Sequence, residues 1–162
     1  MFSYRALNSY GLLACIASLL FAIIYLEGTL FLDPCPLCIL DRLVLTALGL
    51  VFALALISSP KTFLSRMYGA LAIAFSLAGV GLAGRHVWLQ GLPADQVPEC
   101  GPDLYFMLET LPILEVAKKT FTASGSCAEV QWIFAGLTIP QQTLILFIGL
   151  LALSLVLTFR TR

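Results

Sequence analysis

Hydrophobic residues along this chain gather into four long runs that contain no charged side chain. The runs are Ala6–Leu26 with 21 residues, Leu43–Pro60 with 18, Met67–Gly84 with 18 and Val130–Phe159 with 30. A helix needs about 20 apolar residues to cross a hydrocarbon core of about 30 Å. The last run is too long for one crossing, and Gly136 and Pro140 predict that its helix begins near Gln141. The pattern therefore predicts four transmembrane helices.

We expect these helices to span about residues 9–27, 38–58, 66–86 and 142–160, with outer loops over about 28–37 and 87–141. The first run is longer than the apolar region of a signal peptide, so we expect it to remain as a membrane anchor. In the third run, Ala70, Ala74 and Ala78 recur at four-residue steps and Gly79 and Ala83 follow, and such a stripe of small residues lets helices approach closely in lipid. The sequence thus predicts one all-α membrane domain, 1–162, built as a four-helix bundle.

The segment Leu104–Phe121 in the second outer loop also has apolar residues at helical spacing. Glu109, Glu115, Lys118 and Lys119 lie among them, so the segment is too short and too charged to cross a membrane. We expect one or two short amphipathic helices that lie on the membrane surface. The alternative is a plain soluble loop with a small hydrophobic core.

Composition agrees with a membrane protein and excludes one class of partner. Of the 162 residues, 60% are hydrophobic and only 11% are charged, whereas a soluble domain carries about 25% charged residues. Nine basic and nine acidic residues cancel. The bulk charge therefore gives no basis for binding nucleic acid.

Lys and Arg are distributed unevenly about the predicted spans, and this distribution sets the orientation of a membrane protein. The two termini and the link between the second and third spans hold five basic residues and no acidic one: Arg5, Lys61, Arg66, Arg160 and Arg162. The other side holds four basic residues and all nine acidic ones. We therefore expect both termini in the cytoplasm and both outer loops on the opposite face.

Four of the five cysteines fall in the predicted outer loops. Cys35 and Cys38 lie in the first loop, Cys100 and Cys127 lie in the second, and only Cys15 lies within a span. Four thiols on an oxidising face can form disulfides, with three possible pairings. Cys15 is surrounded by Leu, Ala and Ile, and we expect it to be a small apolar packing residue.

The stretch DPCPLCILDR, residues 33–42, places a C-x-x-C pair at the start of the second predicted helix. Unpaired backbone N–H groups and the helix dipole favour a thiolate there. Arg42 follows Cys38 by four residues, so the two side chains share one helix face. Its guanidinium would favour the thiolate further or hold a polar head group; alternatively, it extends to lipid phosphates. At the border of lipid and water, the pair can meet both a lipid-soluble redox carrier and a soluble protein.

Two explanations without redox chemistry compete for this pair. Structural zinc sites combine a C-x-x-C with two further Cys or His at matching spacing. Here no second C-x-x-C exists and His86 is the only histidine, so we expect no metal site. The other explanation is an inert structural disulfide. Redox exchange is favoured because two cysteine pairs in separate loops can form a relay, in which a thiolate of one attacks the disulfide of the other.

The C-x-x-C stretch is one of several distinctive motifs. They are CPLCILDR at the head of the second span, GVGLAGRHVWLQ at the end of the third, the single loop cysteine Cys100, and ASGSCAEVQWIFAGLTIPQ before the fourth. Together they resemble the DsbB family of bacterial disulfide bond formation proteins. The resemblance implies a thiol:quinone oxidoreductase of the bacterial inner membrane, with periplasmic cysteines, that reoxidises a soluble DsbA-like thiol oxidase.

A membrane quinone, ubiquinone or menaquinone, is the electron acceptor that the resemblance implies. No haem ligand set and no iron–sulfur ligand set occurs in the sequence to compete for that role. By the same resemblance, Cys100 would form a mixed disulfide with the DsbA-like partner, and Cys127 would be its loop partner and exchange with Cys35. Cys38 would be the thiolate that contacts the quinone ring, with Arg42 assisting.

Two further residues match the family. His86 matches a histidine near the quinone site, and Glu27 matches a glutamate at the outer end of the first span. Each also fits a simpler role, as an interfacial histidine and as a helix-end charge. Two other functions stay open: a quinone reductase related to the vitamin K epoxide reductases, and a non-enzymatic membrane protein braced by disulfides. The first is disfavoured because its C-x-x-C is expected late in the chain.

Overall fold

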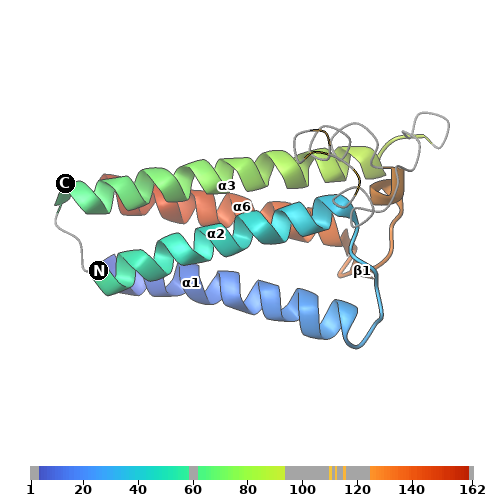
Figure 1. Ribbon diagram of the computed structural model, residues 1–162, viewed down its shortest axis with the longest axis horizontal. Coiled ribbons are helices and arrows are strands. Elements are labelled where there is room, and N and C mark those ends of the chain that lie inside the picture. Colours follow the sequence, from blue (N-terminus) through green and yellow to red (C-terminus); the bar gives the residue numbers. More distant parts are fainter. Residues whose placement is uncertain are drawn as a thin grey trace.

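Four long helices dominate the computed structural model, which describes residues 4–58, 62–93, 110, 112, 115 and 125–160. They are α1 (Tyr4–Leu20) continued by η1 (Phe21–Glu27), α2 (Pro36–Ser58), α3 (Thr62–Gln90) and α6 (Ile139–Arg160). The helices run side by side as an elongated bundle (Figure 1). Each span, with α1 and η1 counted together, is long and apolar enough to cross a membrane. The predicted four-helix membrane fold is confirmed.

Two of the helices have a proline in their first turn and begin earlier than predicted. α2 begins at Pro36 rather than near residue 38, and α6 begins at Ile139, before Pro140, rather than near residue 142. The first backbone N–H groups of a helix have no partner within the helix, so a proline in the first turn removes no hydrogen bond. Pro140 therefore does not delay the start of α6.

The second outer loop is described only in part. The predicted surface helix over Leu104–Phe121 lies outside the described residues, apart from Thr110, Pro112 and Glu115. Cys100 also lies outside them. The described end of this loop contains a short 3₁₀ helix, η2 (Gly125–Ala128), and the chain then leads to α6.

The first span ends in a π-helix, which no feature of the sequence predicted. η1 covers Phe21–Glu27, and the N–H of Gly28 donates to the carbonyl oxygen of Ile23 at 3.0 Å, a five-residue step. A π-helix has a wider turn than an α-helix and is rare, and it often occurs at functional sites. The wider turns change the faces on which Leu26 and Glu27 lie, and both are used in the site described below.

A two-stranded antiparallel hairpin lies between η2 and α6. β1 (Ile133–Phe134) pairs with β2 (Leu137–Thr138) through a two-residue turn. The turn residues Ala135 and Gly136 have φ values of 52° and 80°. Positive φ at both positions is typical of the type I′ turn, whose twist matches that of the strands. Gly136 is therefore a hairpin residue and not the boundary of a helix.

Aromatic side chains connect this hairpin to the end of the first span. Trp132 stacks on Phe134 with ring centroids 5.7 Å apart, and it also lies against Phe21 and Tyr25 of η1. Trp and Tyr are enriched where a membrane protein meets the interface between lipid and water. The cluster marks the end of the bundle that carries the hairpin.

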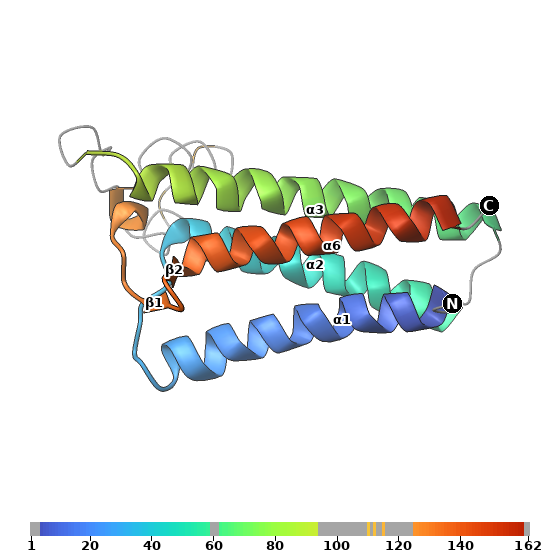
Figure 2. The same cartoon turned by 180° about the vertical axis from the view of Figure 1, so that it is seen from behind.

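The two chain termini lie at the opposite end of the bundle from the hairpin (Figures 1 and 2). The start of α2, the short helix η2 and the strands β1 and β2 gather at the hairpin end (Figure 2). The C-x-x-C pair and Cys127 therefore share one end of the molecule.

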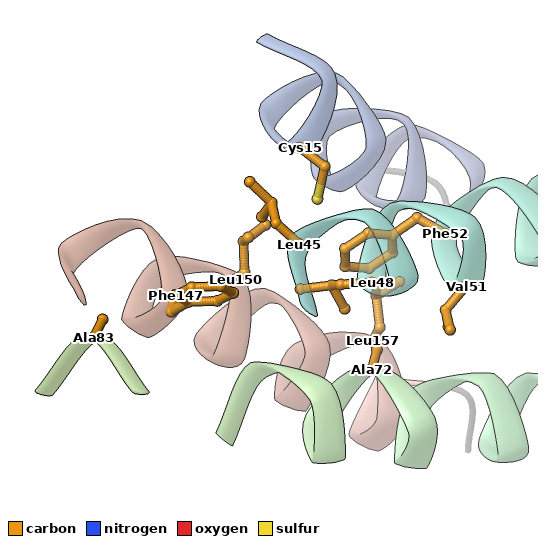
Figure 3. Packing of buried hydrophobic residues seen from close by; sticks show 10 residues of the cluster. All are labelled: Cys15, Leu45, Leu48, Val51, Phe52, Ala72, Ala83, Phe147, Leu150 and Leu157. Atoms are coloured by element: carbon orange, nitrogen blue, oxygen red, sulfur yellow. The ribbon is translucent and has the colours of Figure 1, made fainter. Parts of the chain in front are cut away.

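The core between the helices is apolar and closely packed (Figure 3). It is built from one cluster of buried residues: Cys15, Leu45, Leu48, Val51, Phe52, Ala72, Ala83, Phe147, Leu150 and Leu157. Cys15 is only 1% exposed and lies against Gly49 of α2, where an added Cβ would be 3.3 Å from the Cys15 Cβ. It is a packing residue, as its apolar neighbours in the sequence predicted.

The small residues that α3 packs against its neighbours differ in part from those predicted, since Gly79 and Ala83 are buried as expected but the three alanines before them are not. Ala70, Ala74 and Ala78 are exposed. The buried stripe alternates steps of three and four: Gly69, Ala72, Ser76, Gly79 and Ala83. Steps of four drift around a helix of 3.6 residues per turn, whereas alternating steps stay on one face. Close approach of α3 to α6 at Gly79 leaves no room for a Cβ beside the ring of Phe147.

Candidate functional site: a buried thiol cluster beside an apolar pocket

The C-x-x-C pair forms the N-terminus of α2. Cys35 directly precedes Pro36, the first residue of the helix, and the backbone N–H of Cys38 donates to the Cys35 Sγ at 3.3 Å. Cys35 therefore caps the helix with its sulfur, as Ser or Asp does at other helices. The Sγ atoms of Cys35 and Cys38 are 2.9 Å apart. Both sulfurs thus lie where the helix dipole favours negative charge.

Cys127 lies next to this pair in space, although it is far from it along the chain. It lies in η2, is 1% exposed, and packs in a small cluster with Cys35, Leu37 and Leu89. The sulfurs of Cys35 and Cys127 and a ring nitrogen of His86 all lie within 4.8 Å of one another. The fold therefore brings Cys127 into reach of Cys35, whereas the sequence left three pairings open.

Two glutamine side chains connect the Cys127 segment to the rest of the bundle. The Gln131 amide donates to the carbonyl oxygen of Asp33 at 3.2 Å. The Gln90 amide, in the last residue of α3, donates to the carbonyl oxygen of Glu129 at 3.4 Å. These bonds place the segment over the start of α2 and the end of α3.

The protonation of Cys35 follows from its neighbours. Hydrogen bonds with the sulfurs of Cys127 and Cys38, together with burial, raise the pKa of the Cys35 thiol above its ordinary range. The Cys35 thiol is the donor and the Cys38 sulfur is the acceptor in the contact between them. Cys38 is also the more exposed of the two and is the one that lines the pocket described below. Cys35 is therefore placed to exchange with Cys127, and Cys38 to face the pocket.

His86 and Asp41 place polar atoms in this buried region. The His86 Nε2 lies 3.7 Å from the Cys35 Sγ. Its Nδ1 and the Oδ1 of Asp41 are buried without a hydrogen-bond partner among the described residues. Unpaired buried polar atoms are uncommon and often mark a binding site. Asp41 was not among the site residues predicted from sequence, although an acidic residue within a span is a functional signal.

Glu27 and Arg42 form an ion pair near the thiol cluster. The Arg42 Nη1 donates to the Glu27 Oε1, which connects the last residue of η1 to α2. Both side chains are half-buried. Glu27 is therefore a partner of Arg42 and not only a charge at the end of a helix.

A pocket of about 80 Å³ lies beside these groups. Its polar wall consists mainly of Cys38, Asp41, Arg42, His86 and Gln131, and most of the remaining wall is apolar. A second hollow, of about 380 Å³, lies between the first span and α6 and shares part of the same wall. The shared residues are Ser18, Ala22, Leu26, Ile139, Thr143 and Leu146. A mostly apolar pocket with a few polar groups at one end is typical of a small-molecule site.

Comparison with known proteins gives a consistent assignment. The family model described as "Disulfide bond formation protein DsbB" matches residues 4–157. The Disulfide bond formation protein B of Nitrosococcus oceani is 52% identical over 124 residues, which cover 76% of this chain and 73% of that protein. The protein of the same name from a Psychrobacter species is 43% identical over 164 residues, covering 99% and 94%. That of Saccharophagus degradans is 42% identical over 152 residues, covering 94% and 91%. The chain belongs to the DsbB family of membrane disulfide bond formation proteins.

Proposed function

We propose that this protein is a thiol:quinone oxidoreductase that reoxidises a periplasmic DsbA-like dithiol protein and passes the electrons to a membrane quinone. One observation carries the proposal above all others. Cys127, Cys35 and Cys38 lie in succession, from a loop segment to the wall of an apolar pocket. The first two are within exchange distance, and the third faces the pocket.

In the first exchange, a thiolate of the partner attacks Cys100 in a Cys100–Cys127 disulfide. A mixed disulfide forms and Cys127 leaves as a thiolate. The second thiolate of the partner then attacks the mixed disulfide and releases Cys100. The partner leaves with a disulfide, and the loop pair is left as a dithiol that holds the two electrons.

In the second exchange, Cys127 attacks Cys35 in a Cys35–Cys38 disulfide. The Cys127–Cys35 bond forms while Cys38 leaves as a thiolate, at a helix N-terminus that stabilises its charge. Cys100 then attacks Cys127, which restores the loop disulfide and releases Cys35. The raised pKa of Cys35 favours its protonation on release. The Cys35–Cys38 pair is thus left as a dithiol that holds the two electrons, with Cys38 beside the pocket, and these electrons would pass to the quinone as the Cys35–Cys38 disulfide forms again.

The pocket fits a quinone by its shape and by its polar groups. A quinone supplies a two-electron, two-proton acceptor that dissolves in the bilayer. The guanidinium of Arg42 offers a fork of donors to a carbonyl oxygen, and the ion pair with Glu27 holds it in place. His86 adds a ring nitrogen, and the Cys38 sulfur lies in the same wall.

The hollow between the first span and α6 would hold the isoprenoid tail. Most of its wall is apolar, and it continues from the pocket through Ala22, Leu26 and Leu146. The π-helix η1 contributes Ala22 and Leu26 to both parts. A lipid-soluble substrate would therefore enter from the bilayer and present its ring to Cys38.

The distribution of basic residues indicates how the protein is oriented in the membrane. Five basic residues without an acid flank the termini and the link between α2 and α3, which favours the cytoplasm for that end. The start of α2, where Cys35 and Cys38 lie, and η2, which contains Cys127, are at the opposite end (Figure 1). In this orientation the thiol cluster faces the periplasm, where disulfides persist and a soluble thiol oxidase is present.

The test uses purified protein in detergent with a reduced DsbA-like dithiol protein and a water-soluble quinone analogue. We expect the quinone to be reduced only when the dithiol protein is present. Cys38→Ser should abolish the reaction, and Cys15→Ala should leave it intact because Cys15 lies in the core between the helices. Full turnover by Cys38→Ser would overturn the proposal. A protein that dithiothreitol destabilises but that transfers no electrons to quinone would instead be disulfide-braced and non-enzymatic.

A further inference from the structure

We propose that the fully reduced protein binds one thiophilic divalent cation, Zn²⁺ or Cd²⁺, through Cys35, Cys38, Cys127 and His86, and that bound metal blocks oxidation of the cluster. The binding itself requires neither a quinone nor a protein partner. It therefore stands apart from the function proposed above, although the block on electron transfer rests on that function.

The donor atoms already lie close to the arrangement that zinc needs. Zinc binds Cys at about 2.3 Å and His at about 2.0 Å in a tetrahedron, so neighbouring donors lie about 3.4–3.8 Å apart. The Cys35 Sγ and His86 Nε2 are 3.7 Å apart. The Cys127 Sγ lies within 4.8 Å of both, and the Cys38 Sγ lies 2.9 Å from that of Cys35. Shifts of about 1 Å would bring the donors of Cys35, Cys127 and His86 to these spacings, and Cys38, which lies outside that group of three, would move further to supply the fourth ligand.

The surroundings of the cluster favour a bound metal. Cys35, Cys127 and His86 are 8%, 1% and 3% exposed, so few water molecules compete for their donor atoms. The N–H of Cys38 donates to the Cys35 sulfur, and such outer-shell hydrogen bonds stabilise a metal-bound thiolate. Three thiolates and one divalent cation leave a single negative charge, which the N-terminus of α2 favours.

Metal binding and disulfide exchange use the same sulfurs, so each excludes the other. Binding requires the thiolates and releases their protons to solvent, without any change of oxidation state. A disulfide between any two of the three cysteines removes two ligands. The cation therefore binds the reduced protein and not the oxidised one, and it stabilises the reduced protein by mass action. Zinc at the outer face would thus inhibit reoxidation of the cluster.

The test titrates the reduced protein in detergent with Zn²⁺ against a chromophoric chelator, and with Cd²⁺ while thiolate-to-metal absorbance is followed. We expect one ion per chain and a Cd²⁺ band of the intensity given by three thiolates. Cys127→Ser and His86→Gln should each weaken binding by about a hundredfold or more, since loss of an outer-shell partner alone weakens it by about tenfold to a hundredfold. The disulfide-containing protein should not bind. Helix content is checked by circular dichroism for each variant.

Matched controls are Cys15→Ala and Cys100→Ser, which remove a thiol outside the proposed ligand set and should bind as the unaltered chain does. The proposal fails if binding is weaker than micromolar, if Cys100→Ser abolishes it, or if the Cd²⁺ band of the unaltered protein reports fewer than three thiolates. The last result needs no variant and so does not depend on how a variant folds. Since no quinone is present, none of these results bears on quinone reduction.

Discussion

The guanidinium of Arg42 donates a hydrogen bond to the carboxylate of Glu27, so the end of η1 is fixed to the start of α2 beside the thiol cluster. The pair determines where the donors of Arg42 lie on the wall of the pocket. Its two members lie fifteen positions apart, on segments that the first outer loop connects. Their contact also holds the first span against α2 at the end where the pocket opens.

We expect Arg42→Met to raise the KM for quinone by about tenfold or more, because a charge-assisted hydrogen bond contributes about 1.5–3 kcal/mol. Glu27→Gln should raise it less, since the guanidinium remains but is held less firmly. Steady-state kinetics with a quinone analogue measures both. Arg66→Met, at an exposed position near the start of α3, is the control. A larger effect from Glu27→Gln than from Arg42→Met would contradict this order.

The reduced protein should lose stability as the pH rises above about 8.5, the ordinary pKa of a thiol. Folding raises the pKa of Cys35, because its thiol donates to neighbouring sulfurs and is buried. The stability contributed by a group with a raised pKa is present below the unfolded pKa and is lost as the pH rises above it. Thermal unfolding in detergent, from about pH 7 to about pH 10, should show a steeper decline than in Cys35→Ser. Equal slopes would show that Cys35 does not hold its proton in the folded protein.

Gly79→Ala should destabilise the bundle by about 1–3 kcal/mol, the usual effect of overpacking. An added Cβ would overlap the ring of Phe147, which is fully buried and cannot move aside. Gly81→Ala is the matched control two positions further along α3, because no atom lies within 4 Å of its Cβ position. That variant should be neutral or slightly stabilising, since alanine favours helix. Thermal unfolding in detergent compares the two, and equal midpoints would mean that α3 and α6 do not approach closely at Gly79.

A maleimide that cannot cross bilayers should label Cys38 in intact spheroplasts. Cys38 is the more exposed thiol of its pair and is therefore the one to test. The measurement uses reduced variants that retain a single cysteine. Ser58→Cys, at the other end of α2, is the control and should be labelled only after lysis. The reverse pattern would place the thiol cluster in the cytoplasm and would contradict the proposed orientation.

The sequence by itself determined the number of spans and the position of the C-x-x-C pair. Both depend on local information. A segment that crosses lipid must satisfy its own backbone hydrogen bonds and carry about 20 apolar residues in succession. Cys35 and Cys38 belong to one helix turn, so their spacing already places them together at its N-terminus. Cys15 was equally predictable, since all its neighbours in the sequence are apolar.

Tertiary structure decided which face of each helix is buried and how the first span ends. Ala74 and Ser76 are both small, yet only Ser76 is buried. Which face of α3 is buried depends on how α3 is rotated relative to α6. The sequence of one helix alone does not specify this rotation. The π-helix η1 and the hairpin turn at Ala135 were likewise not predicted, because their sequences carry only weak local signals for these conformations.

Tertiary structure also assembled the site. His86 and Cys127 approach Cys35 only because the end of α3 and the short helix η2 pack on the start of α2. Glu27 contacts Arg42 only because the end of η1 lies beside α2. The reactivity of a single cysteine pair is encoded in one turn of helix. The contacts that give it a partner, a pocket and a set of metal ligands depend on packing between segments far apart in the sequence.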